Sequence, residues 1–364
     1  MIFSNIEKQI LFLGPYSKQP KGGVASVMAE YKKIYPKAYF VSSTNSKNKL
    51  TKICGVIWGI INFLFLLSTR PHIKIIHIHG ASYSSFYRKF LFFRISRFFG
   101  KKVIYHIHGG KYHIFFKNAK SIERQLIQNF INHSECIICL SHSWKIFFES
   151  QFSPKRLSII PNIIEEPKLF KKLSKYQSAK NFLFLGSIST NKGIWLLLDV
   201  LREHITEIDG KAVFHIGGNG ETKKLKNLIQ EYDLNDVVKF IGWVNGEFKH
   251  DQLSSADVYI QPSYNEGLPI SILEAMSYSL PILSTTVGGI PEVVTQKNGI
   301  LCEPGNKEEL WRAIKFFIYA DNSSLSKMGE ESFLMVQPHL PEAVHKRLNY
   351  LYNSLMIKDE KHSK

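Results

Sequence analysis

The stretch that decides the fold is Ser263-Tyr264-Asn265-Glu266-Gly267-Leu268-Pro269-Ile270-Ser271-Ile272-Leu273-Glu274-Ala275-Met276. It follows a short apolar run, residues 257–261, which has the length and composition of a buried strand. Proline suits the first turn of a helix, because its missing N–H has no partner there. A helix start offers unpaired backbone N–H groups to an anion. In this stretch they belong to Gly267, Leu268, Ile270 and Ser271, and glycine also lets a ligand approach closely. The stretch therefore predicts a strand–loop–helix unit with an anion site.

Working outward, the same alternation of short apolar runs and helical segments fills both halves of the chain. The predicted strands are 9–14, 38–42, 73–79, 102–108, 135–140 and 157–161, then 181–185, 212–217, 237–241, 257–261, 281–284 and 299–302. The helical segments include 24–34, 83–99, 122–131, 193–204, 222–232, 270–279 and 307–319. Nearly continuous apolar strands between helices indicate parallel sheets covered on both faces. We expect an α/β fold with two Rossmann-like doubly wound domains facing a central crevice.

The pattern pauses at residues 166–180, which contain Pro167 and several lysines and have no clear strand. We therefore predict a first domain at 1–165, a linker at 166–180 and a second domain at 181–340. Residues 341–364 should form a C-terminal helix and a charged tail that packs back on the first domain.

Two glutamates mark the predicted helix: Glu266 precedes it and Glu274 lies eight residues further on. At 1.5 Å rise per residue they are separated by roughly 12 Å. The paired carboxylates of a glycosidase lie only about 5–9.5 Å apart. The spacing instead suits two groups that hold opposite ends of one elongated ligand.

The stretch resembles the Glu-x7-Glu signature of the family 4 retaining glycosyltransferases, which have the GT-B fold. The likeness extends over residues 181–305 in the family's order. The matching segments are Phe184-Leu185-Gly186-Ser187, Asn191-Lys192-Gly193-Ile194, His215-Ile216-Gly217-Gly218-Asn219-Gly220-Glu221, Phe240-Ile241-Gly242-Trp243-Val244 and Gly288-Gly289-Ile290-Pro291-Glu292. The resemblance implies a nucleotide-sugar-binding second domain and an acceptor-side first domain.

The resemblance also implies roles for single residues. Glu274 would bind the ribose of the donor nucleotide, and Glu266 would contact the donor sugar beside the amides of Gly267 and Leu268. Lys192 would neutralise the diphosphate. Gly217 and Gly242 would lie in the glycine-rich turn and in the base-binding segment. The family commonly has an arginine where this chain has Ser187, so Lys192 is the only cation of its loop.

In the first domain the likeness is looser. Gly23 follows the first strand at the start of a helix, where it would lie near the donor phosphates and the acceptor. His108 follows another strand, and the resemblance places it beside the donor sugar. His79, and less so His77 and His106, are alternatives, and core burial remains open for each of them.

Two absences bear on the chemistry. The chain has no Asp-x-Asp motif, so we expect no metal and no other cofactor. Residues 1–160 contain no Asp, and their few glutamates do not end strands, which leaves histidines as the only candidate bases of that domain. Retention of the anomeric configuration, which the resemblance implies, needs no such base.

Charge is distributed unevenly along the chain. Residues 1–160 contain 24 Lys and Arg against 5 Glu, a formal charge of +19, whereas 161–364 contain 23 against 25 acidic residues, or −2. The segment 87–102 interleaves cations with aromatic residues, a pattern typical of helices at anionic membrane surfaces but also of ordinary domain helices. We expect peripheral attachment to the inner face of the cell membrane from the cytoplasm, and a glycan or lipid-diphosphate-linked acceptor of bacterial surface-polysaccharide assembly such as O-antigen or capsule.

Two features have structural interpretations. The apolar run 53–67 is shorter than the roughly 20 residues of a transmembrane helix, and we expect a buried helix there, with membrane insertion as the alternative. Cys136 and Cys139 lie on one predicted strand and should be buried thiols that share neither a metal nor a disulfide.

The sequence leaves three alternatives open, of which one, a catalytically silent binding paralogue, is disfavoured by the intact Glu266, Glu274 and Lys192. A nucleotide-sugar 2-epimerase of the same fold would need acid–base carboxylates in the crevice, and the first domain has no Asp to supply them. A nucleic-acid-binding protein would fit the basic charge, but the chain has no recognition motif for nucleic acid, and we expect none as a partner.

Overall fold

The computed structural model describes residues 6–15, 22–43, 49–168 and 179–360. The chain divides into two compact units: residues 1–164 together with 339–364 form unit 1, and residues 165–338 form unit 2. Each unit is built on a six-stranded parallel sheet, so the predicted α/β class and the two doubly wound domains are confirmed. Residues 166–168 of the expected linker belong to unit 2, and 169–178 lie outside the described residues.

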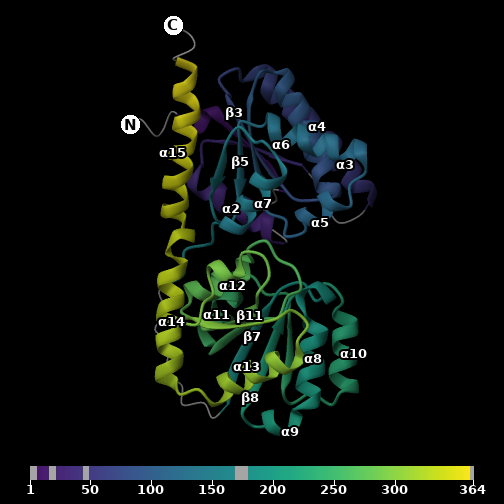
Figure 1. The fold of residues 1–364 in the computed structure, drawn as a ribbon, viewed down its shortest axis with the longest axis vertical. Helices are drawn as coiled ribbons and strands as arrows, with labels where there is room; N and C mark the ends of the chain where they lie inside the picture. Colours follow the sequence, from purple (N-terminus) through teal and green to yellow (C-terminus); the bar gives the residue numbers. More distant parts are fainter. Residues whose placement is uncertain (1–5, 16–21, 44–48, 169–178, 361–364) are drawn as a thin grey trace. The chain divides into compact units, whose positions relative to one another are not determined.

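Unit 1 has the strand order β2-β1-β3-β4-β5-β6. The strands are β1 (Ile10–Gly14), β2 (Tyr39–Ser42), β3 (Ile75–Gly80), β4 (Lys102–Ile107), β5 (Cys136–Cys139) and β6 (Leu157–Ile159). The helices are α2 (Gly23–Ile34), α3 (Lys49–Thr69), α4 (Ser84–Phe98), α5 (Tyr112–Lys117), α6 (Ser121–His133), α7 (His142–Gln151) and α15 (Pro341–Glu360). Figure 1 shows α2 and α15 on one face of this sheet and α3 and α4 on the other.

The alternation of side chains along β3 explains these layers. Ile76 and Ile78 point into the apolar cluster that includes Phe63 of α3 and Phe92 of α4. His77 and His79 point to the opposite face, where both rings lie against Tyr31 of α2. On that same face α15 is attached by two hydrogen bonds: Tyr352 Oη lies 2.6 Å from His77 Nδ1, and Tyr35 Oη donates to Asn349 Oδ1 at 2.8 Å.

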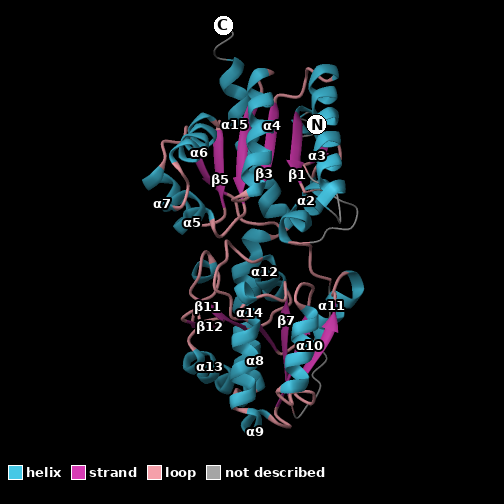
Figure 2. Cartoon of the chain, turned by 90° about the vertical axis from the view of Figure 1, so that its right-hand side faces the viewer, coloured by secondary structure: helices cyan, strands magenta, loops and turns pink. Residues whose placement is uncertain are grey.

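Unit 2 has the strand order β12-β11-β10-β7-β8-β9. The strands are β7 (Lys180–Leu185), β8 (Ala212–Gly217), β9 (Val238–Gly242), β10 (Val258–Gln261), β11 (Ile282–Thr285) and β12 (Gly299–Cys302). The helices are α8 (Ile194–Glu203), α9 (Ile205–Ile208), α10 (Thr222–Glu231), α11 (Gly246–Ser255), α12 (Ile270–Ser277), α13 (Lys307–Tyr319) and α14 (Asn322–Val336). One face packs against α8, α10 and α13, while α12 lies against β10, β11 and α14. Figure 2 marks these helices and strands by colour.

The expectation of a buried helix at 53–67 is wrong in its burial. A helix forms there, as α3, but only one of its faces is covered: Gly59, Phe63 and Leu67 are buried. Six large apolar side chains on the opposite face are between 37% and 67% exposed, namely Ile53, Ile57, Trp58, Ile61, Leu64 and Phe65. The composition is apolar all round the helix, so it gave no indication of which face the sheet covers. Within the described residues, we find no helix whose length and hydropathy would let it cross a bilayer.

The prediction for the two strand cysteines is confirmed. Cys136 and Cys139 are buried on β5 and neither forms a disulfide. Burial raises the pKa of the Cys136 thiol to about 11 and that of Cys139 to about 12, which leaves both protonated and unreactive.

Candidate active site

The strand order of unit 2 places the candidate site at a topological switch point. β7 and β10 are hydrogen-bonded neighbours, and the chain leaves β7 towards α8 on one face of the sheet but leaves β10 towards α12 on the other. In doubly wound folds a crevice opens where the connections diverge in this way, at the carboxyl ends of the strands. Lys192 lies in the loop after β7, and Glu266 lies in the loop after β10.

These two loops are joined by hydrogen bonds. The side-chain amide of Asn191 donates to the carbonyl of Asn265 at 3.0 Å, and the backbone N–H of Tyr264 donates to the carbonyl of Asn191 at 2.9 Å. Gly193 makes this approach possible, since its φ is +70° and a Cβ there would lie 1.8 Å from the carbonyl oxygen of Pro262. Lys192 is predicted from the sequence to lie in the site, whereas the role of Asn191 as a link between the loops is visible only in the structure.

Lys192 and Glu266 meet at the switch point. Lys192 Nζ lies 2.5 Å from Glu266 Oε1, and their side chains are 19% and 11% exposed. The same carboxylate oxygen accepts hydrogen bonds from Ser263 Oγ at 2.8 Å and from Gln261 Nε2 at 3.1 Å. The carboxylate and the ammonium group are therefore held in fixed positions and remain partly accessible to a ligand.

Gln261 organises this part of the site, although the sequence analysis did not select it. Its Oε1 accepts hydrogen bonds from Tyr259 Oη at 3.0 Å and Ser271 Oγ at 2.7 Å, so its Nε2 is directed at Glu266. Tyr259 Oη in turn accepts a hydrogen bond from the backbone N–H of Leu185 at the end of β7, at 3.3 Å. A glutamine as the last residue of a buried strand is the sequence signal that could have identified it, because a buried amide needs partners.

The loop after β11 packs against the backbone of Glu266 and Gly267. Gly289 N–H donates to the carbonyl of Gly267 at 2.6 Å. Gly288 has a φ of +59°, and a Cβ there would lie 2.1 Å from the carbonyl oxygen of Glu266. Gly288 is therefore required for the close packing of these two backbone segments.

Glu274 lies on α12 and pairs with a lysine that the sequence analysis missed. Lys249 Nζ of α11 lies 2.8 Å from Glu274 Oε1 and 3.6 Å from Glu165 Oε2. Burial favours the neutral amine, but the two carboxylates outweigh it and raise the pKa of Lys249. Both glutamates of the motif thus have a lysine partner, and a ligand hydroxyl at either carboxylate would lie next to a fixed cation.

The other predicted residues of unit 2 surround the same sheet edge. Gly217 and Gly242 are register partners at the carboxyl ends of β8 and β9. Gly267 and Leu268 are buried, directly before α12. Pro269 occupies the N-cap position rather than the first turn, so α12 begins at Ile270. Ser187, where the family has an arginine, is exposed in the loop after β7.

In unit 1, Gly23 begins the helix that follows β1, and His108 directly follows β4. Gly23 is exposed and is the first residue of α2. His108 follows β4 and is half-buried; its Nδ1 lies 2.9 Å from Asn162 Oδ1, and its Nε2 lies 2.9 Å from His79 Nδ1. Because Asn162 Oδ1 can only accept, His108 Nδ1 donates, and its Nε2 accepts from His79. Desolvation lowers the pKa of His108 to about 4, although the bond to Asn162 opposes this shift.

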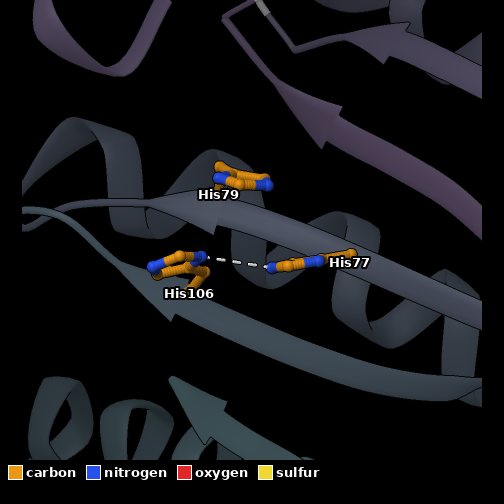
Figure 3. Close-up of side chains that lie close together, drawn as sticks. All are labelled: His77, His79 and His106. Carbon is orange, nitrogen blue, oxygen red and sulfur yellow. Dashed lines mark hydrogen bonds between the residues drawn. The ribbon is translucent and has the colours of Figure 1, made fainter. Parts of the chain in front are cut away.

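His77, His79 and His106 form a buried cluster beside His108 (Figure 3), and each offers a ring nitrogen within 4.8 Å of the others. The rings are stacked: His77 lies 4.4 Å from His79 and 5.4 Å from His106 between centroids, with interplanar angles of 18° and 19°. Lone pairs of imidazoles lie in the ring plane, so nearly parallel rings direct them along one another rather than to one point. Zinc–imidazole bonds of about 2.0–2.1 Å would require the rings to turn. Burial lowers the pKa of all three, and a stack of neutral rings in the core describes them best.

The family comparisons agree with this geometry. The family model described as Glycosyltransferase Family 4 matches residues 40–166, and the one described as Glycosyl transferases group 1 matches residues 165–335. Lys192, Glu266 and Glu274 all lie in the second match.

Curated relatives include a phosphatidylinositol N-acetylglucosaminyltransferase of Arabidopsis thaliana, which is 26% identical over 304 residues, 82% of this chain and 62% of the relative. An uncharacterized glycosyltransferase of Haemophilus influenzae is 31% identical over 207 residues, 56% of this chain and 57% of the relative. The chain therefore spans somewhat more than half the length of these relatives.

Solved structures show the same fold. Sucrose-phosphate synthase of Thermosynechococcus elongatus superposes with a TM-score of 0.79 at 18% identity, covering 96% of this chain and 100% of that one. Anabaena HepE in complex with UDP-glucose gives a TM-score of 0.75 at 18% identity, with 95% and 99% covered. The chain thus has the GT-B fold, and its two parts match the Glycosyltransferase Family 4 model and the Glycosyl transferases group 1 model in turn.

Proposed function

We propose that the chain is a retaining glycosyltransferase that moves a sugar from a nucleotide-diphosphate sugar to an acceptor hydroxyl. The observation that carries the proposal is the meeting of Lys192 and Glu266 at the switch point of unit 2, 2.5 Å apart and both partly accessible. A cation and a fixed carboxylate at this edge match the two halves of such a donor: the diphosphate requires positive charge, and the sugar hydroxyls require acceptors.

The roles follow from the geometry of each residue. Lys192 would stabilise the charge that develops on the departing diphosphate, assisted by the helix starts after Gly193 and Pro269. Glu266, held by Gln261 and Ser263, would bind hydroxyls of the donor sugar. Glu274 would accept hydrogen bonds from the ribose beside Lys249. Gly217 and Gly242 would leave room for the nucleotide at the ends of β8 and β9.

The state of the histidines supports retention. An inverting enzyme needs a general base, and an efficient base has a pKa near the working pH. The pKa of His108 is lowered to about 4 and both of its ring nitrogens have hydrogen-bond partners. In a front-face mechanism the departing phosphate oxygen takes the proton of the acceptor hydroxyl, so the bond to the sugar breaks and forms on one face without such a base. His108 would then position the donor sugar.

The names of similar proteins support the choice of substrates. HepE has been solved with UDP and with UDP-glucose, which supports a uridine diphosphate donor. The name of the Arabidopsis relative describes transfer to phosphatidylinositol, a phospholipid. We therefore propose a lipid-linked acceptor that carries phosphate, of which a lipid-diphosphate-linked glycan at the inner membrane face is one form. A role in bacterial surface polysaccharides is one setting for it, and phosphoinositide glycosylation is another.

A transfer assay tests the proposal. The protein is incubated with UDP- and GDP-sugars, with and without a lipid extract, and release of nucleoside diphosphate is measured together with the mass of any glycosylated lipid. We expect release that depends on the extract, and a loss of roughly 10²–10³-fold in the Glu266→Gln variant. Glu330→Gln is the matched control, because Glu330 is exposed on α14, and this variant should retain full activity.

The stereochemistry of the product separates the alternatives. NMR of the new linkage should show the anomeric configuration of the donor, whereas an inverted product would exclude retention. Conversion of the nucleotide sugar to a stereoisomer without any acceptor would identify an epimerase instead.

A further inference from the structure

The exposed face of α3 has a composition that is unusual for a surface in contact with water. Trp58 and Phe65 are 67% and 62% exposed, and Ile53, Ile57, Ile61 and Leu64 accompany them on the same side. At 100° per residue these six positions fall within an arc of about 140°. Gly59, Phe63 and Leu67 lie on the opposite side and are buried against the unit. Such a contiguous apolar surface marks an interaction site.

The neighbouring helix α4 continues this surface. α3 and α4 are in contact, with Phe63 and Phe92 edge to face at 5.2 Å between ring centroids, and Figures 1 and 2 both place the helices side by side. On α4, Leu91 is 45% and Phe98 is 87% exposed, with the exposed Arg94 between them in sequence. The helix thus adds both apolar groups and a cation.

The charge around this surface is predominantly positive, although Glu123 accepts a hydrogen bond from Tyr87 of α4 and Glu135 lies 3.9 Å from Arg97 of the same helix. Residues 31–122, which include all of α3 and α4, contain 17 Lys and Arg and no Asp or Glu. Unit 1 as a whole carries a formal charge of +21, from +19 in residues 1–164 and +2 in residues 339–364. At the C-terminal end of α3, Arg70 and Lys74 are exposed, and Lys101 Nζ donates to the carbonyl of Pro71 at 3.2 Å.

We propose that the α3 face is a membrane-docking surface that inserts its apolar side chains into a bilayer rich in anionic lipid. Exposed isoleucine, phenylalanine and tryptophan side chains partition into the interfacial region of a bilayer, and surrounding cations are attracted to its negative surface. Trp58 suits the interface because its ring is apolar and its N–H is polar. Because one side of α3 packs on the sheet, the helix lies along the membrane surface.

The occupant is a lipid surface rather than a second copy of the chain. Two copies meeting through this face would bring two predominantly cationic surfaces together, since residues 31–122 supply no carboxylate. An anionic bilayer supplies both an apolar layer and the opposite charge. The inference deepens the proposed function, because it names the surface through which the enzyme would reach a lipid-linked acceptor. Only this link to the acceptor rests on the proposed function; membrane docking itself does not.

Vesicle co-sedimentation tests the proposal with the full chain. Vesicles of phosphatidylcholine alone and with phosphatidylglycerol are compared at low and high salt. We expect binding to the anionic vesicles that weakens but persists at high salt, because the apolar contribution is not screened. The double variant Trp58→Gln, Phe65→Gln should bind at least tenfold more weakly, since each side chain buries a large apolar area in the bilayer.

The control is Phe316→Gln, Leu334→Gln, which removes two exposed apolar side chains from α13 and α14 of unit 2. It should bind vesicles like the wild type. Circular dichroism and binding of UDP without vesicles should be unchanged in both double variants, which separates this test from a failure of the donor site. Wild-type protein that stays in the supernatant, or a Trp58, Phe65 variant that binds as well as wild type, would overturn the proposal. So would dimers in solution that this variant converts to monomers.

Discussion

Acidification should unfold unit 1 before unit 2. In the described part of unit 1, desolvation lowers the pKa of seven histidines, most strongly that of His77, His79, His106, His108 and His339, and less that of His113 and His345. For His108 and His339 the pKa falls to about 4, against about 6.5 in an unfolded chain. Below pH 6.5 the unfolded chain therefore binds protons that the folded unit does not, and the free energy of unfolding decreases.

The magnitude follows from the number of groups. Each histidine lowers the free energy of unfolding by up to about 1.4 kcal/mol per pH unit, so the five with the strongest shifts together give roughly 6 kcal/mol per pH unit near pH 5.5. Since domains are stable by only about 5–15 kcal/mol, unit 1 should lose its fold between about pH 6 and pH 4.5. Above pH 7 the contribution is constant, because the histidines are neutral in both states.

Urea unfolding followed by circular dichroism between pH 8 and pH 5 measures this slope, and limited proteolysis at each pH identifies the unit that opens. His106→Phe should remove about one histidine's share of the slope. A midpoint for unit 1 that is the same at pH 7.5 and pH 5.5 would refute the reasoning. Preferential cleavage of unit 2 at low pH would do so as well.

Three further predictions concern single positions and the metal question. Gly288→Ala should reduce transfer more than tenfold with little change in the fold, because its Cβ would meet the carbonyl of Glu266 and displace that residue; unchanged transfer kinetics in this variant would speak against the loop contact. Lys89 is buried on α4 beside Ser43 and burial lowers its pKa to about 7, so wild type should gain up to about 1.4 kcal/mol of stability per pH unit between pH 7 and 10 relative to Lys89→Met, as urea unfolding at several pH values would show. Below pH 7 that difference should be constant, because the ammonium is charged in both states. Dialysis against EDTA should leave transfer unchanged, and activity that returns only on adding a divalent metal would contradict the predicted metal independence.

The strand pattern was predictable from sequence because both faces of each sheet are covered. A parallel strand between two helical layers is buried at nearly every position, as Ile75–Gly80 illustrates. Each strand of the described residues therefore coincides with a short apolar run predicted as a strand. Gly193 and Gly288 were indicated only by the family resemblance, and the structure supplies the physical reason for them. Gly193 and Gly288 occupy positions where a Cβ would overlap a backbone carbonyl, and only glycine fits there.

What the sequence could not indicate depends on contacts between distant segments. Nothing in the sequence distinguishes Lys249 from the other lysines; its role follows from its contact with Glu274 in the folded chain. Likewise, Gln261 positions Glu266 because Tyr259 and Ser271 fix the orientation of its side-chain amide. The exposed face of α3 was missed for the opposite reason, since a helix that is apolar all round predicts burial on every side. Which face remains uncovered is set by the sheet beneath it.

The most direct test of the central claim is calorimetric titration of nucleoside diphosphates into the wild type and into Glu274→Gln, with Glu330→Gln as the matched control. If unit 2 holds the donor at its switch point, one nucleoside diphosphate should bind the wild type and the control equally. The Glu274 variant should then lose roughly 1–3 kcal/mol, as expected for a hydrogen bond to a charged group. Equal binding by all three proteins, or no binding to any nucleotide of the panel, would contradict the assignment of the site.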